Sequence, residues 1–208
     1  MELISALDSK APDKAAAVLK KGGLIIYPTD TIYGLGADAS NEAAIRKIFE
    51  IKKRGSRKPV HIVVADIVGA ERFVELTPLA RALAKRFLPG ALTLVLKAKD
   101  EVPRALTAGQ GTLGIRIPDN RFCIETARAL GGGITSTSAN VSGQATGRNI
   151  EEIFSLFPKG FEGIDLVVDG GELPPSLPSS VVDARGAAPI ILREGAIPVA
   201  EILGASAT

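Results

Sequence analysis

Residues 112–140, TLGIRIPDNRFCIETARALGGGITSTSAN, contain the pattern that decides the fold. The segments TLGIRIP and GITSTS have the composition of strands, and DNRFCIETARALGG between them has the spacing of a helix. A helix between two strands is typical of α/β proteins, in which helices cover a sheet. The stretch therefore predicts an α/β fold.

The same alternation extends over most of the chain. Further helices are expected at residues 12–23, 40–54, 77–90 and 149–158, and further strands at 24–28, 59–66, 91–98, 164–171, 179–184 and 189–195. Because strands crowd the C-terminal part, we expect a twisted, mostly mixed central sheet flanked by helices. The length favours a single domain over residues 1–208, with a frayed end at LGASAT, residues 203–208.

The composition argues against several classes of protein. Of the 208 residues 46% are hydrophobic, and Cys123 is the single cysteine, which argues against a disulfide and against a zinc or iron–sulfur site. The N-terminus lacks the features of a signal peptide, and no apolar stretch is long enough to cross a bilayer. We expect a cytoplasmic protein without a membrane partner.

Basic residues gather in one place although the net charge is only +2. Seven Lys or Arg residues fall between Arg46 and Lys58, against one acid, Glu50. The small net charge argues against a general polycationic binder of nucleic acid. The cluster itself fits either a solvated helix face or a binding site.

Within this cluster, Lys52 and Arg54 stand where the helix over residues 40–54 should end. A nearby pair of cations suits an anion with several oxygens, above all a triphosphate, because Arg offers a planar fork and Lys a point charge. The alternative is compensation of the helix dipole. Neither GxGxxG nor GxxxxGK[ST] occurs, so the usual dinucleotide and P-loop sites are not supported.

The segment YPTDTIYGLG, residues 27–36, places polar side chains directly after a buried strand. Thr29, Asp30, Thr31 and Tyr33 follow that strand, and in α/β sheets such positions border the crevice where ligands bind. The alternative is a turn in which the threonines bond local backbone groups.

Arg116 lies in the otherwise apolar strand TLGIRIP, on the face opposite Leu113 and Ile115. A charge in this position must be paired or must face a cleft. Arg116 is therefore a candidate clamp for a substrate carboxylate, and a structural salt bridge is the alternative.

In ITSTSAN, residues 134–140, alternation puts Ser136, Ser138 and Asn140 on one face. A buried face would not carry this row without partners, so these side chains are candidate ligand-holding groups. Ser138 is a poor candidate for a nucleophile because GxSxG is absent and His61 is the only histidine.

These motifs together resemble a known family. YPTDTIYGLG, the Lys52-x-Arg54 pair, GIRIP, STSANVSG, PSSVVD and ILREG have the order and approximate spacing of the YrdC-type L-threonylcarbamoyladenylate synthases, from about Gly22 to Ile197. The resemblance implies a YrdC-like fold. It also implies synthesis of L-threonylcarbamoyl-AMP and pyrophosphate from L-threonine, bicarbonate and ATP with Mg2+, for N6-threonylcarbamoyladenosine in tRNA, with tRNA-modifying transferase proteins as partners.

The resemblance also assigns residues to roles. Lys52, Arg54, Ser138 and Asn140 would form the catalytic tetrad around ATP and the carbamate. L-Threonine would be held by Thr29 or Thr31, Arg116, Ser136 and Ser179. The nucleotide site would be completed by Thr112, Thr146 and Arg193. No protein ligand for a metal is predicted.

Some features depart from the family or leave alternatives open. Many members have proline where this chain has Gly55, and His61 matches no clear ligand position, so its role stays open. The chain ends where longer two-domain members continue, so we expect the single-domain form. The alternatives are a module that binds double-stranded RNA or tRNA through the basic cluster, and a related carbamoyl-adenylate chemistry with another amine or carbamoyl donor.

Overall fold

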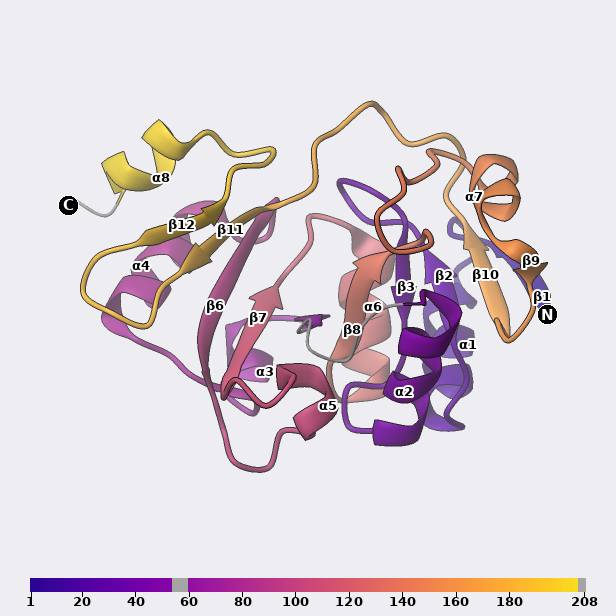
Figure 1. Cartoon of the computed structure of the whole chain (residues 1–208), viewed down its shortest axis with the longest axis horizontal. Coiled ribbons are helices and arrows are strands. Elements are labelled where there is room, and N and C mark those ends of the chain that lie inside the picture. Colours follow the sequence, from indigo (N-terminus) through magenta and orange to yellow (C-terminus); the bar gives the residue numbers. More distant parts are fainter. Residues whose placement is uncertain (54–59, 206–208) are drawn as a thin grey trace.

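A mixed, twisted sheet organises the molecule, as the strand pattern predicts. The computed structural model describes residues 1–53 and 60–205. Within these residues eleven strands join one sheet in the order β1-β10-β2-β3-β8-β4-β7-β6-β11-β12, with β5 beside β6 (Figure 1). The strands are β1 (Glu2–Ser5), β2 (Ile25–Tyr27), β3 (Gly34–Gly36), β4 (His61–Val63), β5 (Val74–Glu75), β6 (Leu92–Ala98), β7 (Thr112–Arg116), β8 (Ile134–Ser138), β10 (Leu166–Asp169), β11 (Ser180–Asp183) and β12 (Ile190–Arg193), and β9 spans Pro158–Phe161.

Helices cover the sheet, and several of them begin at a residue whose side chain caps the helix. They are α1 (Ala11–Lys20), α2 (Glu42–Ile51), α3 (Ile67–Ala70), α4 (Pro78–Phe87), α5 (Arg104–Thr107), α6 (Arg121–Leu130), α7 (Ile150–Leu156) and α8 (Val199–Ala205). The side chains of Asn41, Thr77, Asn120 and Asn149 each accept a hydrogen bond from a backbone N–H of the first turn of their helix. Such capping satisfies donors that a helix start leaves without a partner.

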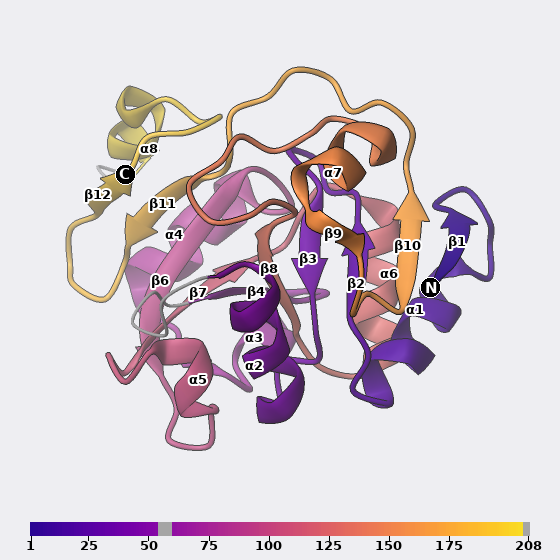
Figure 2. The ribbon, with the colours of Figure 1, turned by 45° about the vertical axis from the view of Figure 1, so that its right-hand side comes forward.

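Three apolar clusters form the core. One packs α1 and α6 against β2 and β10, and a second packs α2 and α7 against the other side chains of β2, β3 and β10. The third joins α4 and α8 to β4, β6, β7 and β11. The two ends of the sheet are thus packed separately, and Figure 2 shows the strands β8, β4 and β7 in the middle between them.

The proline-rich segment, residues 171–180, is an ordered connection. It leads from β10, second in the strand order, to β11, ninth in that order. Figures 1 and 2 both show this connection passing over the top of the molecule. It therefore delivers Ser179 to the far half of the sheet.

The structure adds elements that the pattern did not predict, and it corrects one expectation. The short elements β1, β3, α3, β5, α5, β9 and α8 were not expected. The end of the chain was expected to fray from Leu203, but α8 continues to Ala205 because Ile202 and Ala205 are buried in the core. None of the helices formed by residues 1–53 and 60–205 has the length and apolar character that a bilayer crossing requires.

Candidate active site

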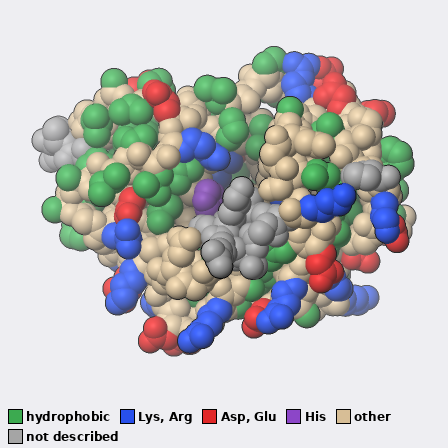
Figure 3. Space-filling view, in the orientation of Figure 1, with side chains coloured by type: hydrophobic (Ala, Val, Ile, Leu, Met, Phe, Trp, Pro, Cys, Tyr) green, Lys and Arg blue, Asp and Glu red, His purple; other side chains and the backbone are tan. Residues whose placement is uncertain are grey.

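Most of the predicted site residues that the structure describes line one open cavity of about 180 Å3 near the middle of the sheet. In Figure 3 the face is hollowed there, with the single histidine, drawn in purple, and blue basic side chains beside it. The lining consists of Thr29, Thr31, Ile32, Tyr33, Gly34, Val60, His61, Thr93, Arg116, Ser136, Thr137, Ser138, Pro178, Ser179 and Arg193. The volume is below the range of pockets for drug-sized ligands, so it suits an amino acid better than a whole nucleotide.

The floor of the cavity is a row of neighbouring strands. His61 pairs with Ser136 across β4 and β8, and Ile62 pairs with Ile115 of β7, which puts His61 beside Gly114. A Cβ atom on Gly114 would lie 2.5 Å from Cδ2 of the His61 ring. Glycine at this position therefore leaves the space that the imidazole occupies.

Arg116 forms a salt bridge and also lines the cavity, so the structural role and the role of a carboxylate clamp are compatible. It is 6% exposed, and Nη2 lies 2.6 Å from Oδ1 of Asp30. Nη1 donates to Oγ1 of Thr31 at 2.9 Å, and Nε donates to the carbonyl of Gly90 at 3.3 Å. The guanidinium is thereby fixed in orientation, and Asp30 offsets part of its charge.

The two threonines of the YPTDTIYGLG segment hold this arginine. Oγ1 of Thr29 donates to the carbonyl of Ile32 at 2.7 Å, and it lies 3.1 Å from Oγ1 of Thr31. A hydroxyl has one proton to donate, so Thr31 must be the donor to Thr29. The hydrogen bonds therefore run in one direction, from Arg116 through Thr31 and Thr29 to the backbone. The segment thus forms the turn that was one alternative, and it also borders the cavity, as the other alternative predicted.

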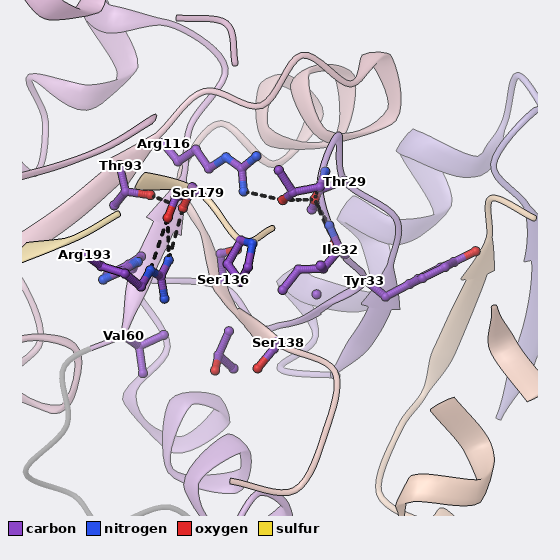
Figure 4. A pocket seen from close by; sticks show the side chains of 15 residues that line it. Thr29, Ile32, Tyr33, Val60, Thr93, Arg116, Ser136, Ser138, Ser179 and Arg193 are labelled. Atoms are coloured by element: carbon purple, nitrogen blue, oxygen red, sulfur yellow. Dashed lines mark hydrogen bonds between the residues drawn. The ribbon is translucent and has the colours of Figure 1, made fainter. Parts of the chain in front are cut away.

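Another side of the cavity is formed by Thr93 of β6, Ser179 just before β11 and Arg193 of β12. Arg193 donates from Nη2 to the carbonyl of Ser179 at 2.8 Å, and Oγ of Ser179 lies 2.8 Å from Oγ1 of Thr93 (Figure 4). Desolvation, and then the charge of Arg116, hold the pKa of Arg193 below its ordinary value. Two guanidinium groups thus face one small space, which favours an anionic group in the ligand.

Lys52 reaches the Ser/Asn segment, as the tetrad requires, but it does so as a buried side chain. Its Nζ donates to Oδ1 of Asn140 at 2.8 Å, to the carbonyl of Asn140 at 2.7 Å and to the carbonyl of Ser138. From the sequence Lys52 is a cation that would face an anion in a cleft, and this expectation is wrong, because the side chain is only 1% exposed. Arg54 and Gly55 lie outside the described residues.

The row of polar groups on β8 forms as predicted and is cross-linked. Oγ of Ser138 donates to Oδ1 of Asn140 at 2.7 Å, and Nδ2 of Asn140 donates to the carbonyl of Gln144. Ser136 and Ser138 line the cavity, and so does Thr137, which alternation put on the other face. Asn140 thus acts as the link between Lys52, Ser138 and the loop that follows.

Two predicted nucleotide residues are not brought to this cavity. Thr112 begins β7 and pairs with Lys97 of β6, and Oγ1 of Thr146 donates to the neighbouring carbonyl of Gly147 at 3.5 Å. Neither residue lines the cavity. Their roles toward a nucleotide stay predictions.

Sequence reasoning missed Thr93, Val60 and Pro178, which also line the cavity. Thr93 lies in the alternating strand ALTLVLKA and on the face of Arg116, so alternation could have found it. Val60 and Pro178 come from connecting segments, and no local pattern places them in the site.

Other reactive groups nearby are held in neutral forms. Burial raises the pKa of the Cys123 thiol, whose Sγ lies 3.2 Å from the carbonyl of Pro28. Burial also raises the pKa of Tyr33 to about 12. Its hydroxyl donates to the carbonyl of Gly171 at 2.8 Å, and Figure 4 shows it directed away from the other labelled side chains. Neither group has the ionised form that a nucleophile needs.

A family model and named relatives match this chain. The family model Sua5_yciO_yrdC, described as telomere recombination, matches residues 17–195. A threonylcarbamoyl-AMP synthase of Pyrococcus abyssi is 36% identical over 189 residues, which are 90% of this chain and 55% of that protein. A putative threonylcarbamoyl-AMP synthase of Methanocaldococcus jannaschii is 35% identical over 200 residues, 94% of this chain and 93% of that protein.

The solved structures agree with these matches. The crystal structure of P. abyssi Sua5 complexed with L-threonine has a TM-score of 0.92 and 33% identity, and the match covers 99% of this chain and 61% of that chain. This chain therefore spans little more than half the length of its P. abyssi relative, and the fold of that part is shared.

Proposed function

Because the chain belongs to the Sua5_yciO_yrdC family, we propose that it makes L-threonylcarbamoyl-AMP and pyrophosphate from L-threonine, bicarbonate and ATP. The product would serve the N6-threonylcarbamoyladenosine modification of tRNA, with separate transferase proteins as partners. The observation that carries this proposal is the convergence of Arg116, Ser136 and Ser138 on one small cavity, with Lys52 bonded to Ser138 and Asn140 behind it.

The threonine half of the site follows from the fixed arginine. A carboxylate that meets Arg116 finds a planar pair of donors whose orientation is already held by Asp30 and Thr31. Hydroxyl groups of Ser136 and Ser179 line the same space and can bond the other polar groups of the amino acid. The P. abyssi relative that binds L-threonine supports this choice of ligand.

The nucleotide half would lie toward Lys52, Ser138 and Asn140, with Arg54, Thr112, Thr146 and Arg193 as further proposed contacts. In this reaction an oxygen of threonine carbamate attacks the α-phosphorus of ATP, and pyrophosphate leaves. The protein supplies position and fixed dipoles for the charge that develops at phosphorus. No covalent intermediate with the protein is needed.

Magnesium is proposed only as the companion of ATP. Within residues 1–53 and 60–205 no three His, Cys, Asp or Glu side chains gather as a metal site. These residues do not fit a protein-held metal, and Mg2+ commonly binds through substrate phosphates instead. The proposed Mg2+ would be held by the phosphates of ATP.

The test is direct. The protein is incubated with ATP, MgCl2, bicarbonate and L-threonine, and mass spectrometry is used to detect threonylcarbamoyl-AMP while a coupled assay measures pyrophosphate. Product is expected only in the complete mixture, and Arg116→Gln should raise KM for threonine far more than KM for ATP. Product with serine or with carbamoyl phosphate but not with threonine would replace this proposal by the related carbamoyl-adenylate chemistry.

A further inference from the structure

The α-amino group of the amino acid must lose a proton before it can form a carbamate, and none of the residues proposed above as ligands of threonine or ATP can accept that proton. At neutral pH an α-amino group is largely protonated, and an ammonium has no electron pair with which to attack CO2. A group in the cavity must accept one proton before the nitrogen can react. Arginine and lysine side chains are donors only, and serine and threonine hydroxyls are far too weak as bases.

His61 is the lining residue with the required chemistry. Its imidazole is half-buried in the floor of the cavity, next to Ser136 and above Gly114, so it is held in place by the sheet itself. Histidine changes its protonation state near neutral pH, which is the condition for an efficient general base. His61 and Arg116 line the same cavity of about 180 Å3, so an amino acid whose carboxylate meets Arg116 shares this small space with the ring.

The other titratable groups around the imidazole do not compete for this role. Among the described residues they include Arg116 of β7, Arg193 of β12, Tyr33 before β3, and, next to the cavity, Asp30, Lys52 and Tyr27, whose hydroxyl donates to the carbonyl of Thr135. Asp30 is held by Arg116 at 2.6 Å, and the hydroxyl of Tyr33 points to Gly171. The two guanidinium groups also disfavour an additional positive charge on the substrate, which promotes loss of its ammonium proton.

We propose that His61 accepts a proton from the ammonium group of the amino acid substrate and so releases the amine for carbamate formation. This inference rests on the proposed function. The imidazole nitrogen takes one proton from R–NH3+, and the amine electron pair forms the N–C bond with CO2 as one C=O π bond breaks. The second N–H proton passes to solvent, which leaves the carbamate. The imidazolium returns its proton to bicarbonate, which yields CO2 and water.

The test compares the wild type with His61→Gln over a range of pH. At neutral pH we expect kcat/KM for threonine to fall about 10²-fold or more, the range of a lost general base. The defect should shrink as the pH rises toward the ordinary pKa of the amine, because solvent then supplies the free amine. A structural role would give the same loss at every pH, and that result would overturn the inference.

A second measurement needs no variant. The chain has one histidine, so its imidazole NMR signals need no assignment. They should shift on addition of L-threonine and shift less with N-acetyl-L-threonine, which lacks the ammonium. Wild type that forms no threonylcarbamoyl-AMP would refute the proposed function, whereas active wild type with imidazole signals unaffected by threonine would refute the role of His61 alone.

Discussion

At the scale of single residues, the site is built from side chains that hold one another before any ligand arrives. Arg116 is fixed by Asp30, Thr31 and Gly90, and Lys52 is fixed by Ser138 and Asn140. Such preorganisation lowers the cost of ordering these groups when substrates bind. It also means that substitutions here affect stability as well as activity.

Lys52→Met should therefore destabilise the protein as well as impair catalysis. The change removes the hydrogen bonds from Nζ to oxygens of Ser138 and Asn140, so we expect the free energy of unfolding to fall by about 2 kcal/mol. Urea denaturation measures this loss. The matched control is Lys53→Met, where the side chain is exposed; equal stability of the two variants would contradict the bonding described for Lys52.

Gly114→Ala tests the space beneath the imidazole. The added Cβ would meet the His61 ring at 2.5 Å, closer than atoms pack, so the ring must move. We expect a raised KM for threonine and a displaced imidazole NMR signal. Gly204→Ala is the control, because no atom lies within 4 Å of a Cβ there, and an unchanged KM in Gly114→Ala would show that the ring position does not matter.

At the scale of elements, helices and strands meet the site at their ends. α2 ends at Ile51, directly before Lys52, β8 carries the serines, and the connection after β10 brings Ser179. The hydroxyl of Tyr33, just before β3, accepts from the N–H of Gly170 at 2.9 Å and donates to the carbonyl of Gly171. This pair of bonds anchors the start of that connection.

The buried hydroxyl of Tyr33 predicts that the free energy of unfolding falls at high pH. Burial raises the pKa of Tyr33 to about 12, whereas an unfolded tyrosine titrates near 10. Between these values the unfolded chain releases a proton that the folded chain keeps, so rising pH favours unfolding. Urea titrations at pH 9 and pH 11 should give a larger fall in unfolding free energy for the wild type than for Tyr33→Phe. Equal falls would contradict the raised pKa.

The last helix, α8, provides a test of packing with its own control. Ile202 is fully buried in the cluster with α4, whereas the neighbouring Leu203 is 46% exposed. Ile202→Ala should lower the unfolding free energy by about 2–4 kcal/mol, while Leu203→Ala should change it by about 0.5 kcal/mol or less. Thermal and urea unfolding measure both, and similar losses would contradict the docking of α8.

At the scale of the whole molecule, the central strands join separately packed ends of the sheet around one small cavity. The lining of this cavity comes from β4, β7, β8 and β12, so a ligand that fills it would contact all of these strands. Binding should therefore stabilise the complete fold, and a threonine concentration a hundred times its Kd should add about 2.7 kcal/mol. Thermal unfolding with L-threonine measures this gain. D-Threonine is the control, and equal effects of the two enantiomers would argue against a specific site.

Much of this architecture could be predicted from sequence because it depends on local periodicity. The main helices, the central strands and the mixed character of the sheet follow from spacing, capping residues and turn signals, and so do Arg116 and the row of Ser136 and Ser138. The burial of Lys52 could not be predicted, because its acceptors lie 86 and 88 residues away in the sequence. The short strands β1 and β3 were missed for a related reason, since only their neighbours in the sheet define them.

The hydrogen bonds from Lys52 to Ser138 and Asn140 have a consequence for the arrival of a nucleotide. An ammonium group has three hydrogens to donate, and two carbonyls and one amide oxygen already take a hydrogen bond from Nζ. A phosphate oxygen can accept a hydrogen bond from Nζ only if it displaces one of these acceptors. Nucleotide binding to Lys52 would therefore replace an existing hydrogen bond with a new one. The side chain of Asn140 also donates to the carbonyl of Gln144, so a shift of Asn140 on nucleotide binding would disturb the loop there. The apparent affinity for nucleotide should therefore depend on the stability of that loop.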